Sequence, residues 1–165
     1  LPWIRQVSVK RMLPNTILLS ISESRALAIW QNKGKFSLIN EQGEEIKVSD
    51  LRKFNSLMVV VGKDAPTNTR SLFSFLKTEP ALYRQVKAAV WVSGRRWNLK
   101  MEGEINVRLP EKDPAAAWAK LAEYERIHKI LNKNVQSLDL RIADRLIIRK
   151  KGDPPKGKKS QGQET

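Results

Sequence analysis

The 165-residue sequence predicts an α+β fold, in which one antiparallel β-sheet carries two helices. Over most of the chain, apolar and polar residues alternate with the two-residue period of half-buried strands. Two stretches, near residues 67–76 and 113–131, instead repeat their apolar residues with the period of a helix. Hydrophobic residues make up 41% of the chain and include five Trp, which is typical of a sequence with a folded core.

The first 24 residues predict a β-hairpin. Residues 4–11 alternate loosely, Pro14-Asn15 is a turn signal, and residues 17–22 alternate again. A hairpin alone is only marginally stable in water. We therefore expect it to be covered by upstream elements or by the body of the domain.

Residues 26–61 predict a second set of strands. Asn and Gly in the second turn of this set tolerate the positive φ that tight turns require. The expected order is a strand through Ala26–Trp30, a turn at Lys33-Gly34, a strand at Phe36–Ile39, a turn at Asn40–Gly43, a short strand at Glu45–Val48, a polar loop at Asp50–Asn55 and a buried strand at Leu57–Val61.

The two helices have recognisable N-terminal signals. In the first, Thr67 or Asn68 is expected to cap the helix. Its apolar face is predicted to contain Thr69, Leu72, Phe73 and Leu76. In the second, Asp113 is the expected cap and Pro114 takes the first helical position, where a missing N–H costs nothing. The apolar stripe of this second helix is predicted to contain Ala117, Leu121, Tyr124, His128 and Leu131, ahead of a stop at 132–134.

Strands are expected between and after the helices. Residues 88–92, 97–101 and 105–109 alternate between turns and predict a three-stranded antiparallel meander. Residues 138–142 alternate again, Ala143-Asp144 turns, and 146–148 form a last strand. After Lys151 the composition changes to Gly, Pro, Lys, Ser and Gln, which is typical of a disordered tail.

The chain is strongly basic, with 31 Lys and Arg against 17 Asp and Glu and a net charge of +14. Such a charge suits nucleic acid, anionic membrane surfaces or acidic protein partners. Arg95 and Arg96 place cations beside Trp97, but Trp97 also fits the inward-facing rank of its strand. No nucleic-acid module motif is present. A basic nucleic-acid-binding domain is therefore the alternative interpretation.

The sequence does not indicate catalytic chemistry. Cysteine is absent and His128 is the single histidine, so the usual transition-metal ligands and thiol nucleophiles are missing. Glu102 and Glu104 flank Gly103 at an expected hairpin tip rather than facing a cleft. We predict no catalytic, cofactor-binding or metal-binding residues and no small-molecule substrate. A peptidoglycan-acting enzyme would need a paired acid and base that we do not find.

The last strand carries the clearest candidate for a binding site. Residues 145–149 are apolar on both faces and precede the tail directly. The strand has two possible fates: it is covered inside the sheet, or it is an edge that accepts a strand from a partner. The flanking Arg141, Arg145, Arg149 and Lys150 would favour an acidic partner and disfavour self-pairing.

The chain resembles the extracytoplasmic part of the bacterial cell-division protein family FtsQ, also called DivIB. The segments 1–23, 28–31 and 38–43 resemble the end of that family's POTRA domain and the entry into its larger β domain. Ser137-Leu138-Asp139-Leu140-Arg141, followed by Asp144-Arg145-Leu146, resembles its closing strand pair. The resemblance covers nearly all of residues 1–149.

The resemblance implies three segments: residues 1–24 as the C-terminal part of a POTRA domain, 25–151 as the β domain, and 152–165 as the tail. It also implies a single-pass inner-membrane protein whose periplasmic part is a non-catalytic scaffold for FtsB- and FtsL-like division proteins. The family's partner site falls here on Arg141, Ile142, Arg145, Leu146, Ile147 and Ile148.

No apolar run reaches the roughly 18 residues that span a bilayer. The longest, at 57–61, suits a buried strand. The sequence starts at Leu1 without Met or a signal peptide, and we interpret it as a fragment of a longer protein whose membrane anchor would lie upstream.

Overall fold

The computed structural model describes residues 3–143 and 145–153 and confirms the α+β class. Within these ranges the strands are β1 (Ile4–Met12), β2 (Thr16–Glu23), β3 (Ala26–Asn32), β4 (Lys35–Asn40), β5 (Glu45–Ile46), β6 (Val59–Val61), β7 (Val86–Val92), β8 (Arg96–Met101), β9 (Asn106–Arg108), β10 (Val135–Asp139) and β11 (Ile147–Lys150). The helices are α1 (Ala65–Leu76), α2 (Pro80–Tyr83) and α3 (Pro114–His128), with short 3-10 turns at Arg52–Phe54, Glu102–Glu104 and Ile130–Asn132.

Nine of the strands form one sheet in the order β11-β10-β9-β8-β7-β6-β3-β4-β5. The predicted meander is present, because β7, β8 and β9 pair antiparallel. The sheet is mixed rather than antiparallel throughout: β3 with β6, β6 with β7, and β9 with β10 run parallel. The helices explain two of these parallel pairings. A parallel pair needs a long crossover, which α1 and α2 supply between β6 and β7 and α3 supplies between β9 and β10.

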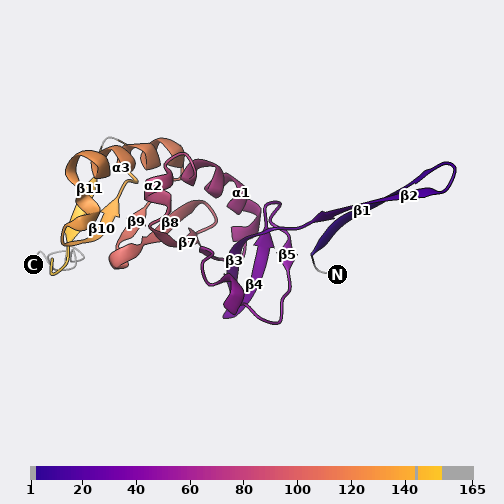
Figure 1. Ribbon diagram of the computed structural model, residues 1–165. Helices are drawn as coiled ribbons and strands as arrows, with labels where there is room; N and C mark the ends of the chain where they lie inside the picture. The colour runs from indigo at the N-terminus through magenta and orange to yellow at the C-terminus, as the bar shows by residue number, and fades with distance from the viewer. Residues whose placement is uncertain (1–2, 144, 154–165) are drawn as a thin grey trace, which may run out of the picture.

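The helices lie along one face of the sheet (Figure 1). On that face, strand register aligns a transverse row of apolar side chains. Every member of the row is at most 1% exposed; the members are Val60, Ala89, Leu99, Val107 and Leu138. The main core therefore lies between the helices and this face.

Helix α1 begins earlier than the sequence predicted. Its N-cap is Asp64, and the Thr67 and Asn68 side chains donate hydrogen bonds back to the Asp64 carbonyl oxygen instead of capping the helix. The cap prediction was wrong because Pro66 already occupies the first turn, where proline is well tolerated. The predicted face is confirmed: Thr69, Leu72, Phe73 and Leu76 are all buried.

Helix α3 begins as expected, with an Asp113 carboxylate oxygen accepting a hydrogen bond from the Ala116 N–H at 3.0 Å. Its principal core residue is Trp118, which the expected stripe omitted. This side chain is fully buried and its Nε1 donates to the Leu76 carbonyl oxygen at 3.2 Å, which joins α3 to α1. His128 is exposed, so its predicted place on the buried stripe was wrong. Its ring lies 5.8 Å from that of Tyr124.

The turn after β4 forms as predicted and depends on glycine. The Asn40 side-chain oxygen accepts hydrogen bonds from the N–H groups of Gln42 and Glu44. Gly43 has a φ of +79°, and a Cβ atom there would lie 2.5 Å from the Pro66 carbonyl oxygen. This turn therefore packs closely against the start of α1 because Gly43 lacks a side chain.

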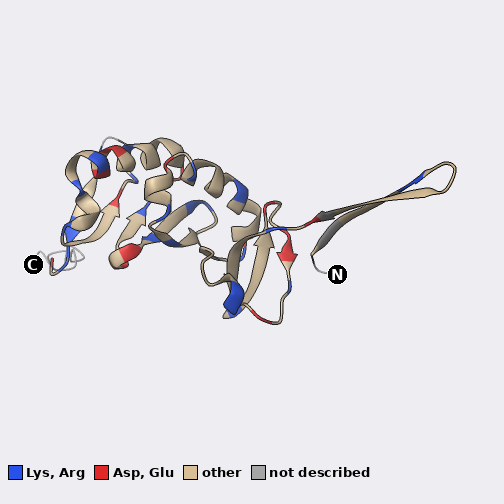
Figure 2. Ribbon diagram, in the orientation of Figure 1, with Lys and Arg blue, Asp and Glu red and all other residues tan. Residues whose placement is uncertain are grey.

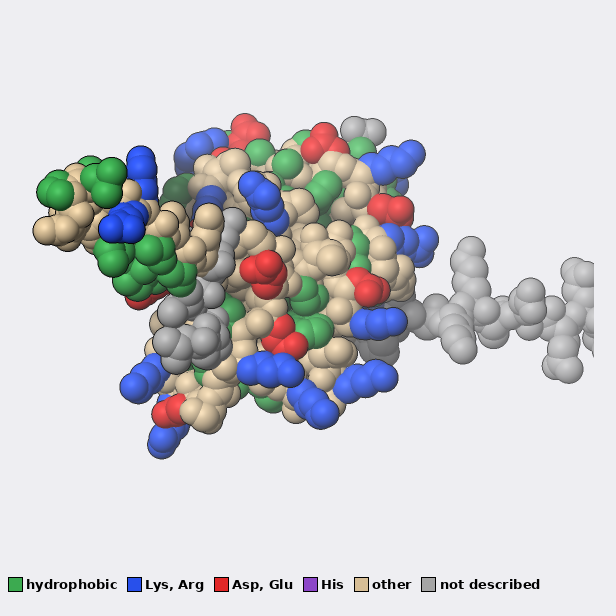
Figure 3. All heavy atoms as spheres, turned by 90° about the vertical axis from the view of Figure 1, so that its right-hand side faces the viewer, with side chains coloured by type: hydrophobic (Ala, Val, Ile, Leu, Met, Phe, Trp, Pro, Cys, Tyr) green, Lys and Arg blue, Asp and Glu red, His purple; other side chains and the backbone are tan. Residues whose placement is uncertain are grey.

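Strands β1 and β2 form a separate two-stranded sheet that projects from the β3–β5 end of the molecule (Figure 1). One face of this hairpin is largely apolar, with Arg11 opposite Ile17 at its far end. Its apolar side chains are about half-exposed or more; they are Val7, Val9, Ile17, Leu19 and Ile21. Figure 3 looks onto this end and shows hydrophobic side chains gathered on the projecting part. The hairpin meets the body where the Trp3 ring stacks on Phe54 at 5.7 Å.

The last two strands are displaced from their predicted positions. The predicted segments were 138–142 and 146–148, whereas β10 covers Val135–Asp139 and β11 covers Ile147–Lys150. Strand β10 ends at Asp139, and the Leu140 N–H makes a last hydrogen bond to the Arg108 carbonyl oxygen of β9. Arg141 then turns back onto the Asp139 carboxylate. Asp144 of the predicted turn and residues 154–165 of the predicted tail lie outside the described residues.

Candidate functional site

Strand β11 is the final strand at one end of the nine-stranded sheet, and in the described residues it pairs only with β10. The antiparallel register places Ile147 opposite Asp139, Ile148 opposite Leu138 and Arg149 opposite Ser137. Ile148 therefore extends the helix-covered face, while Ile147 and Arg149 extend the other face. The sequence left two possibilities for the last strand, a position covered inside the sheet or an open edge. In the described residues it is an open edge.

Both isoleucines of this edge are partly exposed, with 41% of Ile147 and 43% of Ile148 accessible. They lie on opposite faces of the strand, so one strand added beside β11 would cover both. Leu146 behaves differently: it is half-buried and packs against the main core. It therefore anchors the start of the edge.

The remaining predicted residues lie on the segment that leads into β11. Arg141, Ile142 and Arg145 are all exposed, and 52% of Ile142 is accessible. The Arg145 N–H donates to the Ile142 carbonyl oxygen at 3.1 Å. All six predicted residues thus belong to one continuous segment, 141–148. Five of them are exposed and Leu146 is half-buried.

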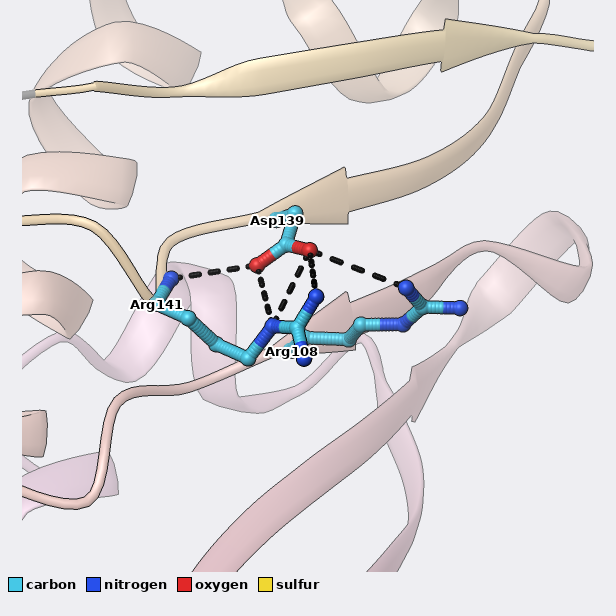
Figure 4. A network of polar contacts seen from close by, with 3 residues as sticks. All are labelled: Arg108, Asp139 and Arg141. Atoms are coloured by element: carbon cyan, nitrogen blue, oxygen red, sulfur yellow. Dashed lines mark hydrogen bonds and ion pairs between the residues drawn. The ribbon is translucent and has the colours of Figure 1, made fainter. Parts of the chain in front are cut away.

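The geometry of this segment depends on Asp139, which the sequence analysis did not select (Figure 4). Its carboxylate accepts hydrogen bonds from the Arg141 backbone N–H at 3.1 Å and from the Arg141 guanidinium at 2.6 and 2.9 Å. Arg108 of β9 approaches the same carboxylate at 3.6 Å. An acidic and a basic residue two positions apart, at the end of an expected strand, are a signal that could have identified this pair.

The protonation of Asp139 follows from these neighbours. Burial by itself raises the pKa of this carboxyl group. The hydrogen bonds from Arg141, and the positive charges of Arg141 and Arg108, act in the opposite direction and are stronger together. The pKa of Asp139 therefore lies below its ordinary value, and the network carries one negative and two positive charges at neutral pH.

Lys120 holds the same segment from the helix side and was also missed by the sequence analysis. Its Nζ donates to the Ala143 carbonyl oxygen at 3.1 Å. Between α3 and this segment lies an open hollow of about 560 Å³, whose basic lining residues are Lys112, Lys120 and Arg141. The segment that precedes β11 is therefore fixed at both Arg141 and Ala143.

The other residues considered in the sequence analysis have structural roles. Trp97 is 3% exposed, so its core position is confirmed. Glu102 and Glu104 are exposed, and they pair with Lys87 and Lys100 at 2.6 Å each. Figure 2 shows Lys and Arg distributed over helices, strands and loops. Within residues 3–143 and 145–153, no three His, Asp or Glu side chains gather as metal ligands.

The fold and the edge together define a class: a small α+β domain whose mixed sheet ends in a partly apolar, basic-flanked strand. Residues 28–141 match the family "Cell division protein FtsQ/DivIB, C-terminal". The chain belongs to this FtsQ/DivIB family, which confirms the resemblance read from the sequence.

Three curated relatives are each named "Cell division protein FtsQ". The protein from Bradyrhizobium diazoefficiens is 33% identical over 160 residues, which are 97% of this chain and 47% of the relative. That from Rhizobium meliloti is 37% identical over 148 residues, 90% of this chain and 48% of the relative. That from Rickettsia typhi is 36% identical over 148 residues, 90% of this chain and 55% of the relative. The chain thus spans about half the length of these relatives.

In the part of the chain that the structure describes, none of the helices combines the length and apolar character needed to cross a bilayer.

Proposed function

We propose that this chain is the periplasmic part of a single-pass inner-membrane protein that acts as a non-catalytic scaffold in bacterial cell division. Its partners would be FtsB- and FtsL-like division proteins, and at least one of them would add a strand to β11. The observation that carries this proposal is the free edge of β11, where Ile147 and Ile148 are accessible on opposite faces. The match to the FtsQ/DivIB family supports the same role.

Strand addition would use two parts of the edge. Backbone hydrogen bonds to β11 supply affinity without regard to sequence, and the side chains on either face select the partner. Ile147 and Ile148 offer apolar contacts on the two faces. Arg145, Arg149 and Lys150 add positive charge along the strand, so acidic residues in the partner would be favoured.

The presence of two separate sheets supports the proposed division of the chain into segments. Residues 1–24, which contain the separate β1–β2 sheet, would complete a POTRA domain. Residues 25–151 would form the β domain, which contains the nine-stranded sheet. The apolar face of the hairpin supports this proposal, because such a face is stable only when another layer covers it.

The proposal is tested by titration calorimetry of the whole chain against the periplasmic part of an FtsB-like protein from the same genome. A DNA duplex serves as the competing ligand, and each titration is run at two salt concentrations. One-to-one protein binding that persists at the higher salt supports the scaffold. Binding to DNA alone, with affinity that falls steeply with salt, would favour the basic nucleic-acid-binding domain instead.

A pair of matched variants locates the site. Ile147→Asp places a charge on the edge, whereas Ile127→Asp places the same charge on α3, where 63% of Ile127 is exposed. We expect Ile147→Asp to weaken partner binding at least about tenfold, because the carboxylate would lose water in the interface. Ile127→Asp should bind as the unmodified chain does. Equal binding by both variants would place the interface away from β11.

A further inference from the structure

The open edge of β11 has a defined end. By the alternation of a strand, the N–H and C=O groups of one residue point toward the neighbouring strand and those of the next point away. The Lys151 N–H donates to the Asn134 carbonyl oxygen at 3.0 Å, on the β10 side. The backbone groups of Lys150 and Ile148 therefore point away from β10, toward the side where a partner strand would add.

The outward groups of Lys150 are already bonded within the chain. An Asp153 carboxylate oxygen accepts a hydrogen bond from the Lys150 N–H at 2.9 Å. The Asp153 N–H in turn donates to the Lys150 carbonyl oxygen at 3.2 Å. Gly152 has a φ of +97°, which is suited to the third position of a tight turn and strained for other residues. The Lys150–Asp153 turn thus closes the edge at its C-terminal end.

Resting on the strand addition proposed above, we infer that Asp153 sets the length and register of the added strand. With Lys150 closed, the outward groups of Ile148 remain within β11 for a partner ladder, and a partner strand must end before Lys150. The same turn removes one donor and one acceptor from the edge that a second copy of the chain would otherwise pair with. Asp153 is therefore a specificity-determining residue at a position outside the predicted site.

Two variants separate the hydrogen bond from the charge. Asp153→Asn removes the negative charge but keeps a side-chain oxygen that can accept from the Lys150 N–H. Asp153→Ala removes the acceptor as well. In the free chain, we expect Asp153→Ala to accelerate hydrogen exchange of the Lys150 amide about tenfold, measured by NMR, while Asp153→Asn stays close to the unmodified chain. Identical Lys150 exchange in all three proteins would overturn the closure.

The second measurement is made in the complex with the FtsB-like segment, again on the Lys150 amide of the labelled chain. Asp153→Ala frees only the outward Lys150 N–H, because the backbone N–H of residue 153 still donates to the Lys150 carbonyl oxygen. Partner binding should therefore slow Lys150 exchange about tenfold in Asp153→Ala, where a partner carbonyl oxygen can accept from the freed N–H, and leave it unchanged in the unmodified chain and in Asp153→Asn. Unchanged Lys150 exchange on binding in Asp153→Ala would overturn the role in register. Absence of binding to the unmodified chain would instead refute the strand addition itself, and the free-chain exchange of Lys150 would still decide whether Asp153 closes the edge.

Discussion

The two ends of the molecule both expose apolar β-structure, but they expose different parts of it. At one end, the β1–β2 hairpin presents a face: Val9 is 65% exposed and Leu19 is 54% exposed, and the two are paired across the strands. At the other end, β11 presents an edge, where Ile147 and Ile148 lie on opposite faces of a strand that pairs on one side only.

This difference determines what each end can bind. A face is covered by another layer of side chains, such as a helix or a second sheet. An edge offers free backbone groups and is completed by a strand. In the described residues β1 and β2 pair only with each other, so the hairpin also has open edges, but its distinguishing feature is the apolar face. The comparison therefore separates an apolar face that needs a covering layer from a strand edge that can accept a partner in the proposed complex.

The largest expected effect tests whether the hairpin folds separately from the body. Trp118→Ala should lower the free energy of unfolding by about 3–5 kcal/mol, because the side chain is fully buried and joins α3 to α1. Leu19→Ala should change it by less than about 0.5 kcal/mol, since that side chain is more than half exposed. Urea unfolding, followed by tryptophan fluorescence, measures both.

The result for Leu19→Ala is the informative part of that pair. A loss of several kcal/mol would mean that the hairpin face is covered in solution and unfolds together with the body. A double variant, Leu19→Ala with Trp3→Ala, would then show whether the Trp3–Phe54 contact transmits the effect.

The next effect tests whether the backbone of the edge, rather than its side chains, carries binding. Leu146→Pro removes the N–H of the residue directly before β11, which donates no hydrogen bond to β10 in the described residues. It should weaken partner binding about ten- to hundredfold. Leu146→Ala removes the same core contact but keeps the N–H, so it should bind within about threefold of the unmodified chain. Similar losses in both variants, after matching for melting temperature, would contradict backbone recognition.

A smaller effect on stability is expected from the ion-pair network of Asp139, Arg141 and Arg108, which lies before β11. Asp139→Asn should cost about 1–3 kcal/mol of stability at neutral pH, because it replaces a charged acceptor of several hydrogen bonds. The pKa of Asp139 is lowered in the folded state, so its contribution is fully present above the unfolded value of about 3.9 and is lost as pH falls through the folded value. The stability difference between the two proteins should therefore shrink only below about pH 4.

Denaturant unfolding of both proteins between pH 3 and pH 7 measures this difference. Arg52→Ala is a useful comparison, because Arg52 also lowers the pKa of its partner Asp50, but this pair is exposed and should contribute little to stability. If the difference in free energy of unfolding between Asp139→Asn and the unmodified chain stayed the same down to pH 3, the pKa of Asp139 would not be lowered in the folded state.

The sequence was sufficient for the features that depend on local pattern. The meander of β7, β8 and β9 and the Asp113 cap of α3 follow from alternation and from turn and cap residues, and both are present. The apolar character of the last strand was equally visible, because residues 145–149 are neighbours in sequence. The family resemblance was inferred from short segments of the sequence. The match of residues 28–141 to the FtsQ/DivIB family supports that resemblance independently.

The features that depend on distant contacts could not be predicted in the same way. The parallel pairing of β9 with β10 depends on how α3 packs, and no alternation pattern encodes strand direction. Trp118 was missed because its partner, the Leu76 carbonyl oxygen, lies 42 residues away. Lys120 was missed for the same reason, since it holds Ala143 across 23 residues. Asp139 and Arg141, by contrast, are two residues apart and were accessible to pattern analysis.

The smallest expected effect separates charge from backbone at the edge. Arg145 is exposed and has no salt bridge in the described residues. Arg145→Ala should therefore leave stability unchanged and weaken partner binding less than about tenfold, mainly through slower association at low salt. Stopped-flow or surface-binding kinetics at two salt concentrations distinguish the two contributions. A loss that appears in the dissociation rate, and that does not depend on salt, would mean that Arg145 makes a desolvated contact, and the partner's acidic residue would then lie directly on β11 rather than around it.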